Sequence, residues 1–434
     1  DKMSLLHRTL IGSLQSIKTD EVLIRGWVYR LRELARTTFV VVRDCSSSIQ
    51  CVANPALVKE AAIRLEEPIE IIGRVVKDPR SSNGLEIEVL QIRRLNEVEG
   101  LLPFHSSSDL ADVGLDIILG NRALSLRNDQ VSDVFKVQAA ILKYFRQYLT
   151  QKHFTEIITS KIVSNGTEGG TNLFEIKYFE RIAYLAQSPQ FYKEQGVAGL
   201  ERVFETGHVY RAEPHATSRH LTEYYSLDLE FGFIDGPEDV ILLEKELLTF
   251  IFNGLNEEFP KLIEKVRSSK LPSMLEVPTW EFEDCLKRLA DKFGRKDLID
   301  DLDPEGERQL CELAREETGI AAVFVLGFPL AARPFYTHPR GTEGSAQSFD
   351  LLFEGLEITT GGQRLHRRSD LENALIARGI EPAAFEDHLK VFDMGMPPHG
   401  GLAIGLERLT TKIMNLSNVR QATLFPRDRY HLNP

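Results

Sequence analysis

The sequence predicts an α+β protein with two domains, a small β-barrel followed by a larger domain built on an antiparallel sheet. Three observations support this. The 434 residues exceed the size of one typical domain. Residues 22–95 contain five short segments with the period-two alternation of strands. From Phe154 onward, antiparallel strand segments alternate with helices, without the regular strand-helix repeat of a doubly wound parallel sheet.

The barrel is expected at residues 1–98. Its five predicted strands are Val22–Leu31, Thr37–Arg43, Ser48–Ala53, Ile69–Val76 and Leu85–Leu95. Between the third and fourth, Pro55–Leu65 has apolar residues at helix spacing. Five strands with a helix after the third are typical of the OB-fold, a Greek-key barrel that commonly binds single-stranded nucleic acid. Other small β-barrels share this pattern, so both alternatives stay open here.

Two side chains suggest a nucleic-acid face on this barrel. Phe39 and Gln50 lie on neighbouring predicted strands. A ring there can stack on a base while an amide reads its edge, although core packing would equally explain Phe39. The net charge of −12 taken alone argues against such a partner. However, the first 100 residues carry fifteen Lys+Arg against fourteen Asp+Glu, and a basic stripe forms at Arg25, Arg30, Arg32, Arg36 and Arg43.

The rest of the chain reads as a linker, at about 99–128, and a catalytic domain at 129–434. A long helix is predicted over Gln130–Gln151, with Val134, Val137, Ile141, Tyr144 and Tyr148 on its apolar face. A mainly helical insertion is expected at about 238–315. Its buried stripe is predicted to contain Leu242, Leu243, Leu247, Phe250 and Ile251.

Composition places the chain among soluble, cytoplasmic enzymes. Hydrophobic residues make up 42% and charged residues 27%, and no apolar run is long enough to cross a bilayer. We therefore expect no membrane association. The four cysteines, Cys45, Cys51, Cys285 and Cys311, lack the spacing of a zinc site and are expected to be reduced.

A polar loop joins two alternating segments that both place polar groups on one face. Upstream, Val203, Glu205, Val209 and Arg211 occupy odd positions. Downstream, Tyr224, Ser226, Asp228 and Glu230 alternate with Tyr225, Leu227, Leu229 and Phe231. Because strand side chains repeat with period two, one face is polar and the other buried. An arginine, carboxylates and an aromatic ring are what an anhydride-forming nucleotide site needs. A salt-bridged hairpin is the alternative interpretation.

A second hairpin gathers carboxylates. Ser348–Phe353 and Leu356–Thr360 read as strands joined by the two-residue turn Glu354-Gly355. Pairing Leu352 with Glu357 and Asp350 with Thr359 places Asp350 and Glu357 on one face. Two carboxylates repel each other unless a cation joins them. An exposed acidic hairpin without a ligand is the alternative.

The segments Gln187–Lys193, Arg211–Glu230, Gly355–Arg364 and Gly400–Arg408, taken in this order, resemble the motifs of class II aminoacyl-tRNA synthetases. Within subclass IIb they are similar to the aspartyl enzymes of the short archaeal type, from about Arg25 to Arg429. The resemblance implies a ligase that activates L-aspartate with ATP and Mg²⁺ to aspartyl-adenylate. It then transfers aspartate to tRNA(Asp) in protein biosynthesis, and tRNA(Asn) stays open as a second acceptor.

The resemblance also implies roles within the nucleotide site. Arg211 would bridge the α-phosphate and the attacking carboxylate, Glu213 would accept from the adenine amino group, and Tyr224 would stack on adenine. His220 and Arg408 would contact the γ-phosphate, and Arg408 lies just inside a predicted helix opened by Gly405, whose free backbone N–H groups also favour anions. The complete implied ATP set is Arg211, Glu213, Arg219, His220, Leu221, Tyr224, Glu357, Gly405 and Arg408, with Arg211 and Arg408 as catalytic residues.

Substrate and metal residues follow from the same resemblance. The implied metal ligands are Asp350, Glu357 and Thr360. Lys193 and Arg364 would bind the aspartate side chain and Asp228 its ammonium group. The complete implied aspartate set is Glu168, Ser188, Gln190, Lys193, Asp228, Thr360 and Arg364, with Glu168 in a closing loop at 167–170. The implied anticodon set is Arg32, Phe39, Gln50 and Glu86, and the third anticodon base would be read near Tyr29 and residues 79–83.

A homodimer is expected from the long helix and a following strand ending at Ser160. Three positions depart from the family pattern: Ser160 replaces a proline, His208 replaces another proline, and Ala35-Arg36 replace glycines. Two alternative hypotheses remain. One is a paralogue that makes free asparagine from an aspartyl-adenylate, and the other is a non-catalytic RNA-binding relative.

Overall fold

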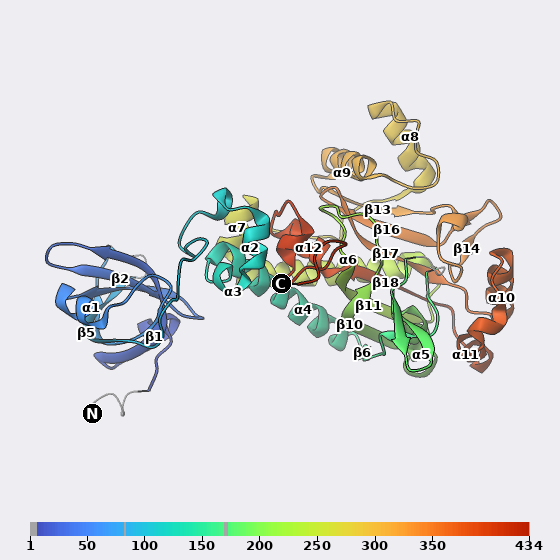
Figure 1. Ribbon diagram of the computed structural model, residues 1–434. Coiled ribbons are helices and arrows are strands. Elements are labelled where there is room, and N and C mark those ends of the chain that lie inside the picture. The colour runs from blue at the N-terminus through green and yellow to red at the C-terminus, as the bar shows by residue number, and fades with distance from the viewer. Residues whose placement is uncertain (1–6, 82–83, 169–171, 434) are drawn as a thin grey trace. The chain divides into compact units, whose positions relative to one another are not determined.

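The computed structural model describes residues 7–81, 84–168 and 172–433. The chain divides into two compact units, Asp1–Ser132 and Asp133–Pro434. The first unit holds a β-barrel and the second a large sheet flanked by helices (Figure 1).

The barrel closes in the strand order β1-β2-β3-β5-β4. Its strands are β1 Glu21–Glu33, β2 Thr38–Arg43, β3 Ser48–Ala53, β4 Pro68–Lys77 and β5 Leu85–Arg94, with helix α1 at Pro55–Ala61. Asn54 caps α1 by accepting a hydrogen bond from the Ala56 N–H, and Pro55 opens the helix. Alternate residues of β2 and β3, including Val40, Val42 and Cys51, fill the interior. The predicted five-stranded barrel with its single helix is confirmed.

The stretch after the barrel, expected to be a linker, is partly folded. It contains the short helices α2 Leu115–Gly120 and α3 Arg122–Ser125. Phe104, Leu110 and Leu124 form a small hydrophobic cluster there. This stretch also buries an ion pair, because the guanidinium of Arg127 binds the Glu66 carboxylate at 3.3 Å.

An eight-stranded sheet forms the centre of the second unit, in the order β12-β13-β16-β17-β18-β11-β10-β6. The strands are β6 Thr155–Glu156, β10 Arg202–Tyr210, β11 Glu223–Gly232, β12 Thr279–Glu281, β13 Ala322–Leu326, β16 Ser348–Phe353, β17 Leu356–Arg364 and β18 His399–Gly405. The six inner strands are antiparallel, as predicted, but the edge pairs β12/β13 and β6/β10 are parallel. Two further sheets are small. The first has three strands: β7 Ile162–Val163, β8 Glu175–Tyr178 and β9 Arg181–Leu185. The second has two: β14 Pro339–Arg340 and β15 Ser345–Ala346.

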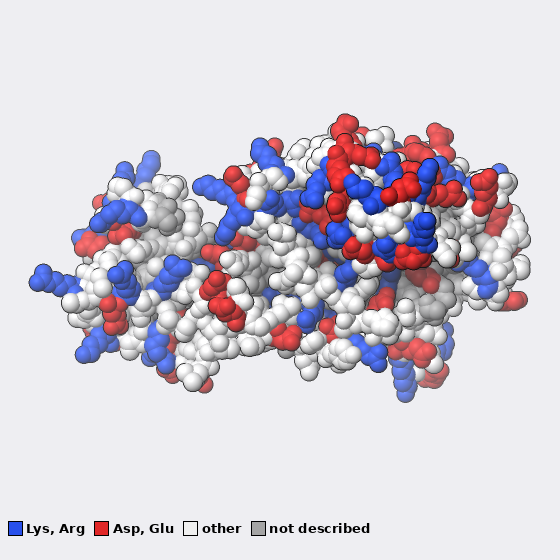
Figure 2. All heavy atoms as spheres, turned by 90° about the horizontal axis from the view of Figure 1, so that it is seen from above, with Lys and Arg blue, Asp and Glu red and all other residues white. Residues whose placement is uncertain are grey.

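Helices cover the sheet and leave one polar area open. The helices α4 Asp129–Gln151, α6 Pro237–Glu258 and α12 Leu406–Ile413 share one large core with the sheet, into which Leu227 and Leu229 point. A second core lies under α8 Phe282–Phe293 and α9 Pro304–Thr318. A third contains residues of α5 Gln190–Leu200, α10 Arg368–Ala377 and α11 Glu386–Leu389. Helix α7 spans Pro260–Arg267. Figure 2 shows mixed acidic and basic side chains gathered over the face that is uppermost in Figure 1, where α8 and α9 lie.

Three sequence predictions about this unit need correction. The buried stripe of α6 is rotated, because Leu242 is 54% exposed. The buried positions are Pro237, Val240, Ile241, Glu244, Leu247, Leu248, Ile251, Phe252 and Leu255. The region 238–315 also contains β12, which the helical prediction missed. The strand after α4 ends at Glu156 rather than Ser160. Among the described residues, no helix is both long and apolar enough to span a membrane.

Candidate active site

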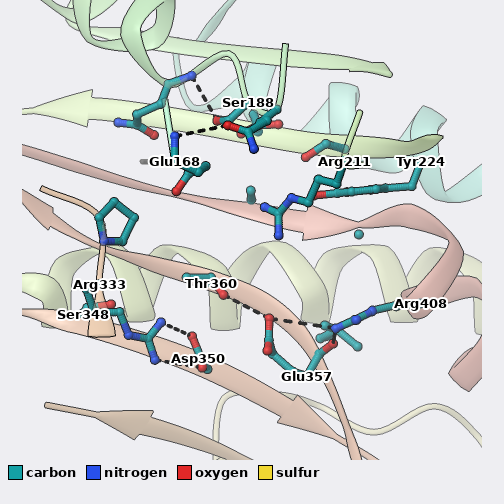
Figure 3. Close-up of a pocket in the computed structure, with 18 of the residues that line it drawn as sticks. Glu168, Ser188, Arg211, Tyr224, Arg333, Ser348, Asp350, Glu357, Thr360 and Arg408 are labelled. Atoms are coloured by element: carbon teal, nitrogen blue, oxygen red, sulfur yellow. Dashed lines mark hydrogen bonds and ion pairs between the residues drawn. The ribbon is translucent and has the colours of Figure 1, made fainter. Parts of the chain in front are cut away.

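A cavity of about 400 Å³ lies over the polar side of the large sheet. Every residue that we expected to bind ATP, aspartate or the metal lines this cavity. They come from segments far apart in the sequence: the loop before β8, α5, the β10–β11 loop, β11, β16, β17, β18 and α12. Figure 3 shows several of these side chains converging from opposite sides.

The two alternating segments form an antiparallel hairpin. Glu205 pairs with Asp228 and Val209 with Tyr224 across β10 and β11. Asp228 lies on the cavity side, whereas Leu227 and Leu229 enter the hydrophobic core. The period-two alternation therefore delivers carboxylates to one side of the sheet and apolar groups to the other, as the sequence predicted.

Four buried charges form a cluster at α5, β11 and β17. The Lys193 Nζ lies 3.0 Å from Asp228 Oδ1 and 3.3 Å from Glu230 Oε2, and its side chain is 1% exposed. The Arg364 Nε donates to Glu230 Oε1 at 3.1 Å. A Cβ atom on Gly401 would lie 2.1 Å from Glu230 Oε2, so only glycine leaves room for this carboxylate. Two cations and two anions thus balance each other away from water.

Cationic donors gather around the β10–β11 loop. The guanidinium of Arg211 lies over the Tyr224 ring, 5.8 Å from its centroid. The Nε atoms of Arg211 and Arg219 are buried and have no hydrogen-bond partner among the described residues. Buried donors without partners are costly. An anionic ligand would relieve this cost at both arginines.

A β-bulge shapes the carboxylate side of the cavity. Leu352 pairs with Glu357 as predicted, but Leu351 pairs with Thr359 and Asp350 with Thr360. The predicted pairing of Asp350 with Thr359 is therefore wrong by one residue, because the extra residue Ile358 interrupts the ladder. The bulge brings Glu357 and Thr360 to the same side, where the Thr360 hydroxyl donates to Glu357 Oε1 at 3.1 Å (Figure 3). The predicted turn holds, with Glu354 and Gly355 both at positive φ.

The side-chain oxygens around this bulge are of the kind that a hard cation binds when phosphates or water complete its coordination. Asp350 is buried and accepts a two-pronged bond from Arg333 at 2.8 and 3.0 Å (Figure 3). Burial and the neighbouring Glu357 raise the pKa of Asp350, against the opposing effect of Arg333. Within residues 7–81, 84–168 and 172–433, no three His, Cys, Asp or Glu side chains are grouped to hold a metal. Asp350, Glu357 and the Thr360 hydroxyl offer oxygen ligands of the kind that Mg²⁺ prefers, and phosphates and water would have to supply the others.

Several residues of the site were missed from the sequence. Arg333 forks Asp350, and the Tyr336 hydroxyl donates to Glu168 Oε1 at 2.9 Å. Both stand in the segment Arg333–Tyr336, which has no periodic signal. Glu194, directly after Lys193, lies 2.8 Å from His399 Nε2, and its histidine neighbours lower the pKa of the carboxyl to about 2 despite burial. The sequence of a short helix does not show which of its charged residues are buried.

Two expectations reach residues outside those described. In the closing loop at 167–170, Glu168 is described and lines the cavity, whereas Gly169 and Gly170 lie outside the described residues. In the segment expected to read the third anticodon base, Ser82 and Asn83 lie outside them as well.

On the barrel, the four expected anticodon residues come together on the outer surface. Phe39 pairs with Arg32 on β1, and Gln50 lies on the adjacent strand β3. The Gln50 amide donates to Glu86 Oε1 at 2.6 Å. Phe39 is half-buried and does not belong to the barrel core.

The basic stripe is shorter than expected. Arg25 forms an ion pair with the buried Glu70 at 2.7 Å. Arg43 is 9% exposed and binds Asp129 at 3.3 Å. These two arginines are therefore structural, and Arg30, Arg32 and Arg36 remain of the stripe.

The departures from the family pattern leave the cavity intact. Ser160 is exposed, and its hydroxyl donates to the Ile162 carbonyl at 3.1 Å. His208 packs edge-on against Tyr225, with 5.0 Å between ring centroids. Neither residue lines the cavity.

Two family matches cover both units. Residues 114–429 match the family described as tRNA synthetases class II (D, K and N), and residues 22–95 match the OB-fold nucleic acid binding domain. The chain therefore belongs to the class II tRNA synthetases of the D, K and N group.

Two relatives that match this chain over nearly its full length are aspartate–tRNA(Asp/Asn) ligases. The chain is 41% identical to the aspartate–tRNA(Asp/Asn) ligase of Deinococcus radiodurans over 435 residues, covering 99% of each chain. It is also 41% identical to the enzyme of the same name from Thermus thermophilus, covering 98% of this chain and all of that one. Among solved structures, the asparaginyl-tRNA synthetase of Pyrococcus horikoshii with asparaginyl-adenylate superposes with a TM-score of 0.88 at 29% identity. That match covers 95% of this chain and 96% of the other.

Proposed function

We propose that this chain is an aspartate–tRNA ligase. It joins the α-carboxylate of L-aspartate to the α-phosphate of ATP with release of pyrophosphate, and then transfers the aspartyl group to the 3′ end of tRNA(Asp). Because this chemistry needs alignment and charge neutralisation more than acid or base catalysis, a cavity rich in fixed cations supports it.

The observation that carries the proposal is the buried pair Lys193 and Arg364. Both cations line the cavity, and both are nearly inaccessible to solvent. A ligand with a second carboxylate could meet both, with Arg364 as a planar fork, while Asp228 receives the ligand ammonium. Asparagine, whose side-chain amide is uncharged, would bring no anion to these two cations, whose partners in the structure are Asp228 and Glu230.

The nucleotide would lie between Arg211, Arg219 and Arg408. Arg211 would bind the α-phosphate and the attacking carboxylate, and Tyr224 would stack on adenine. Glu213 would accept from the adenine amino group, and the Leu221 and Gly405 backbones would complete the site. The orphan Nε donors of Arg211 and Arg219 support this arrangement.

Magnesium would be held by Asp350, Glu357 and the Thr360 hydroxyl. When bound, it would neutralise phosphate charge as pyrophosphate leaves. The protein's own contribution is to keep both carboxylates on one side of β16 and β17, with Arg333 orienting Asp350.

Aminoacylation of purified tRNA tests the proposal. The chain should convert labelled aspartate, ATP and tRNA(Asp) into an alkali-labile aspartyl-tRNA ester. Release of free asparagine in the presence of an ammonia donor would support the paralogue hypothesis instead. Nucleic-acid binding without pyrophosphate release would support the non-catalytic one. Parallel reactions with tRNA(Asn) determine whether that tRNA is a second acceptor, as the name of the Deinococcus relative states for that protein.

We also propose that the chain forms a homodimer. Three large apolar side chains are exposed in the second unit: Ile158 between β6 and β7 at 95%, and Phe179 and Ile182 in the β8–β9 hairpin at 75% and 60%. Exposed apolar side chains are common at protein interfaces, and two-fold dimers are the commonest oligomers.

A further inference from the structure

Glu307 is a carboxylate outside every expected binding set. It lies in the first turn of α9 and is 6% exposed. Its Oε2 atom accepts two hydrogen bonds, one from Arg219 Nη2 and one from the Glu357 backbone N–H at 3.0 Å. One buried oxygen thus connects the loop between β10 and β11 to the start of strand β17.

A second residue closes this network into a ring. The Arg408 Nη1 donates to the Glu357 carbonyl at 2.9 Å, and its Nε donates to the Arg219 carbonyl at 3.3 Å. A closed ring of hydrogen bonds therefore joins four residues from four separate segments of the chain: Arg219, Glu307, Glu357 and Arg408. Three of them line the cavity, whereas Glu307 stands behind it.

The ring holds the Arg219 side chain in one orientation and leaves its Nε able to donate to an anion. Its side chain is 20% exposed, and its Nε is a buried donor without a partner in the described part of the chain. An arginine side chain loses considerable rotational freedom when a ligand orders it. A guanidinium that is already held in place avoids this loss and binds an anion more tightly.

We propose that Glu307 is a positioning residue for the ATP polyphosphate, because it holds Arg219 and the start of β17 in place before the nucleotide arrives. This inference rests on the proposed function, which makes the cavity an ATP site. A carboxylate that only repelled phosphates would have the opposite effect on affinity, so the direction of the change tests the inference.

Titration calorimetry with Mg·ATP on the full chain tests the inference. Glu307→Ala should raise the Kd for Mg·ATP about 2- to 12-fold, the usual loss when one preorganised side chain becomes free. Glu307→Gln keeps the bond to the Glu357 N–H but loses the charge that holds Arg219, so its Kd should rise less. In pyrophosphate exchange, the KM for ATP should rise more than kcat falls, while the KM for aspartate stays unchanged. A general structural defect would instead affect both substrates.

Glu305→Gln is the matched control. Glu305 lies on the same helix but outside the cavity, and it forms an exposed ion pair with Arg308 at 2.6 Å. This variant should bind Mg·ATP like the wild type.

A double variant separates a positioning role from a direct one. Adding Glu307→Ala to Arg219→Ala should raise the Kd much less than Glu307→Ala does alone, because Glu307 acts largely through Arg219. An unchanged or lower Kd in folded Glu307→Ala or Glu307→Gln would overturn the inference, as would an additive double variant. The calorimetric titration measures Mg·ATP binding and needs no aspartate. If the wild type binds Mg·ATP but shows no aspartate-dependent exchange, the proposed function is refuted, and the titration still tests the role of Glu307.

Discussion

Buried charges decide the chemistry of this protein at the scale of single residues. Lys193, Arg364, Asp228 and Glu230 are all nearly inaccessible, and each has an opposite charge within 3.3 Å. Removing one member of such a cluster leaves its partners without compensation. The two cations should therefore be more sensitive to substitution than any exposed arginine or lysine.

Lys193→Ala and Arg364→Ala should each abolish most aspartate activation. We expect a loss of about 2–5 kcal/mol in transition-state binding, the usual effect of truncating one partner of a buried charge pair. Mg·ATP binding should change little. Pyrophosphate exchange across aspartate concentrations measures the first effect, and calorimetry measures the second. Lys390→Ala, which breaks an exposed pair with Asp387, is the control. Near-normal exchange in either active-site variant would refute the assigned specificity.

Glu244 should make stability depend on pH. It is fully buried in α6, and its only described partner is the Thr359 hydroxyl, at 2.5 Å. Burial raises the pKa of its carboxyl to about 8, so the folded protein keeps a proton that the unfolded chain loses above about 4.5. Glu244 should therefore contribute a fall in the free energy of unfolding as pH rises from about 4.5 to 8, by at most ~1.4 kcal/mol per pH unit.

Glu244→Gln should flatten this dependence, since the amide does not titrate. Denaturant unfolding at several pH values measures it. The control is Glu257→Gln, an exposed position on the same helix, which should keep the wild-type slope. Equal slopes in Glu244→Gln and wild type would show that Glu244 is not protonated in the folded state.

At the scale of elements, alternation was sufficient to predict the barrel strands and both hairpins. It failed where tertiary packing overrides a local pattern. Ile358 forms a bulge because β17 must pair with both β16 and β18, and no local signal marks that residue. The buried face of α6 is likewise fixed by the sheet beneath it, so a run of leucines left its phase ambiguous. Arg333, Tyr336 and Glu307 were missed because their roles depend on contacts 17 to 168 residues away.

The outer face of β1, β2 and β3 gives an element-level prediction. Phe39 lies outside the barrel core, next to Arg32 and Gln50. If its ring stacks on an anticodon base, Phe39→Ala should weaken tRNA charging by roughly 1–3 kcal/mol and leave pyrophosphate exchange unchanged. Charging kinetics on full-length tRNA measure this, with thermal melting to verify folding. Leu95→Ala, at an exposed apolar position directly after β5, is the control. Unaltered charging by folded Phe39→Ala would exclude the anticodon role.

At the scale of the whole molecule, the two compact units support a division of labour. The barrel would select the tRNA, and the larger unit would activate the amino acid. The exposed Ile158, Phe179 and Ile182 add an oligomeric prediction, because a dimer interface would cover such side chains.

Sedimentation should therefore show a dimer at micromolar concentration. Replacing Ile158 by Asp should shift the equilibrium toward monomer, since a charge would enter an apolar interface. Leu101→Asp, at a fully exposed position, is the control and should remain dimeric. An active wild-type monomer at this concentration would contradict the proposed dimer.

The most direct test of the central claim is ATP–pyrophosphate exchange by the wild-type chain, with aspartate, with asparagine and without an amino acid. Because Lys193 and Arg364 place two buried cations in the cavity, aspartate should support rapid exchange and asparagine should give no more than the amino-acid-free background. Exchange that depends on asparagine, or no exchange with either amino acid, would contradict the account.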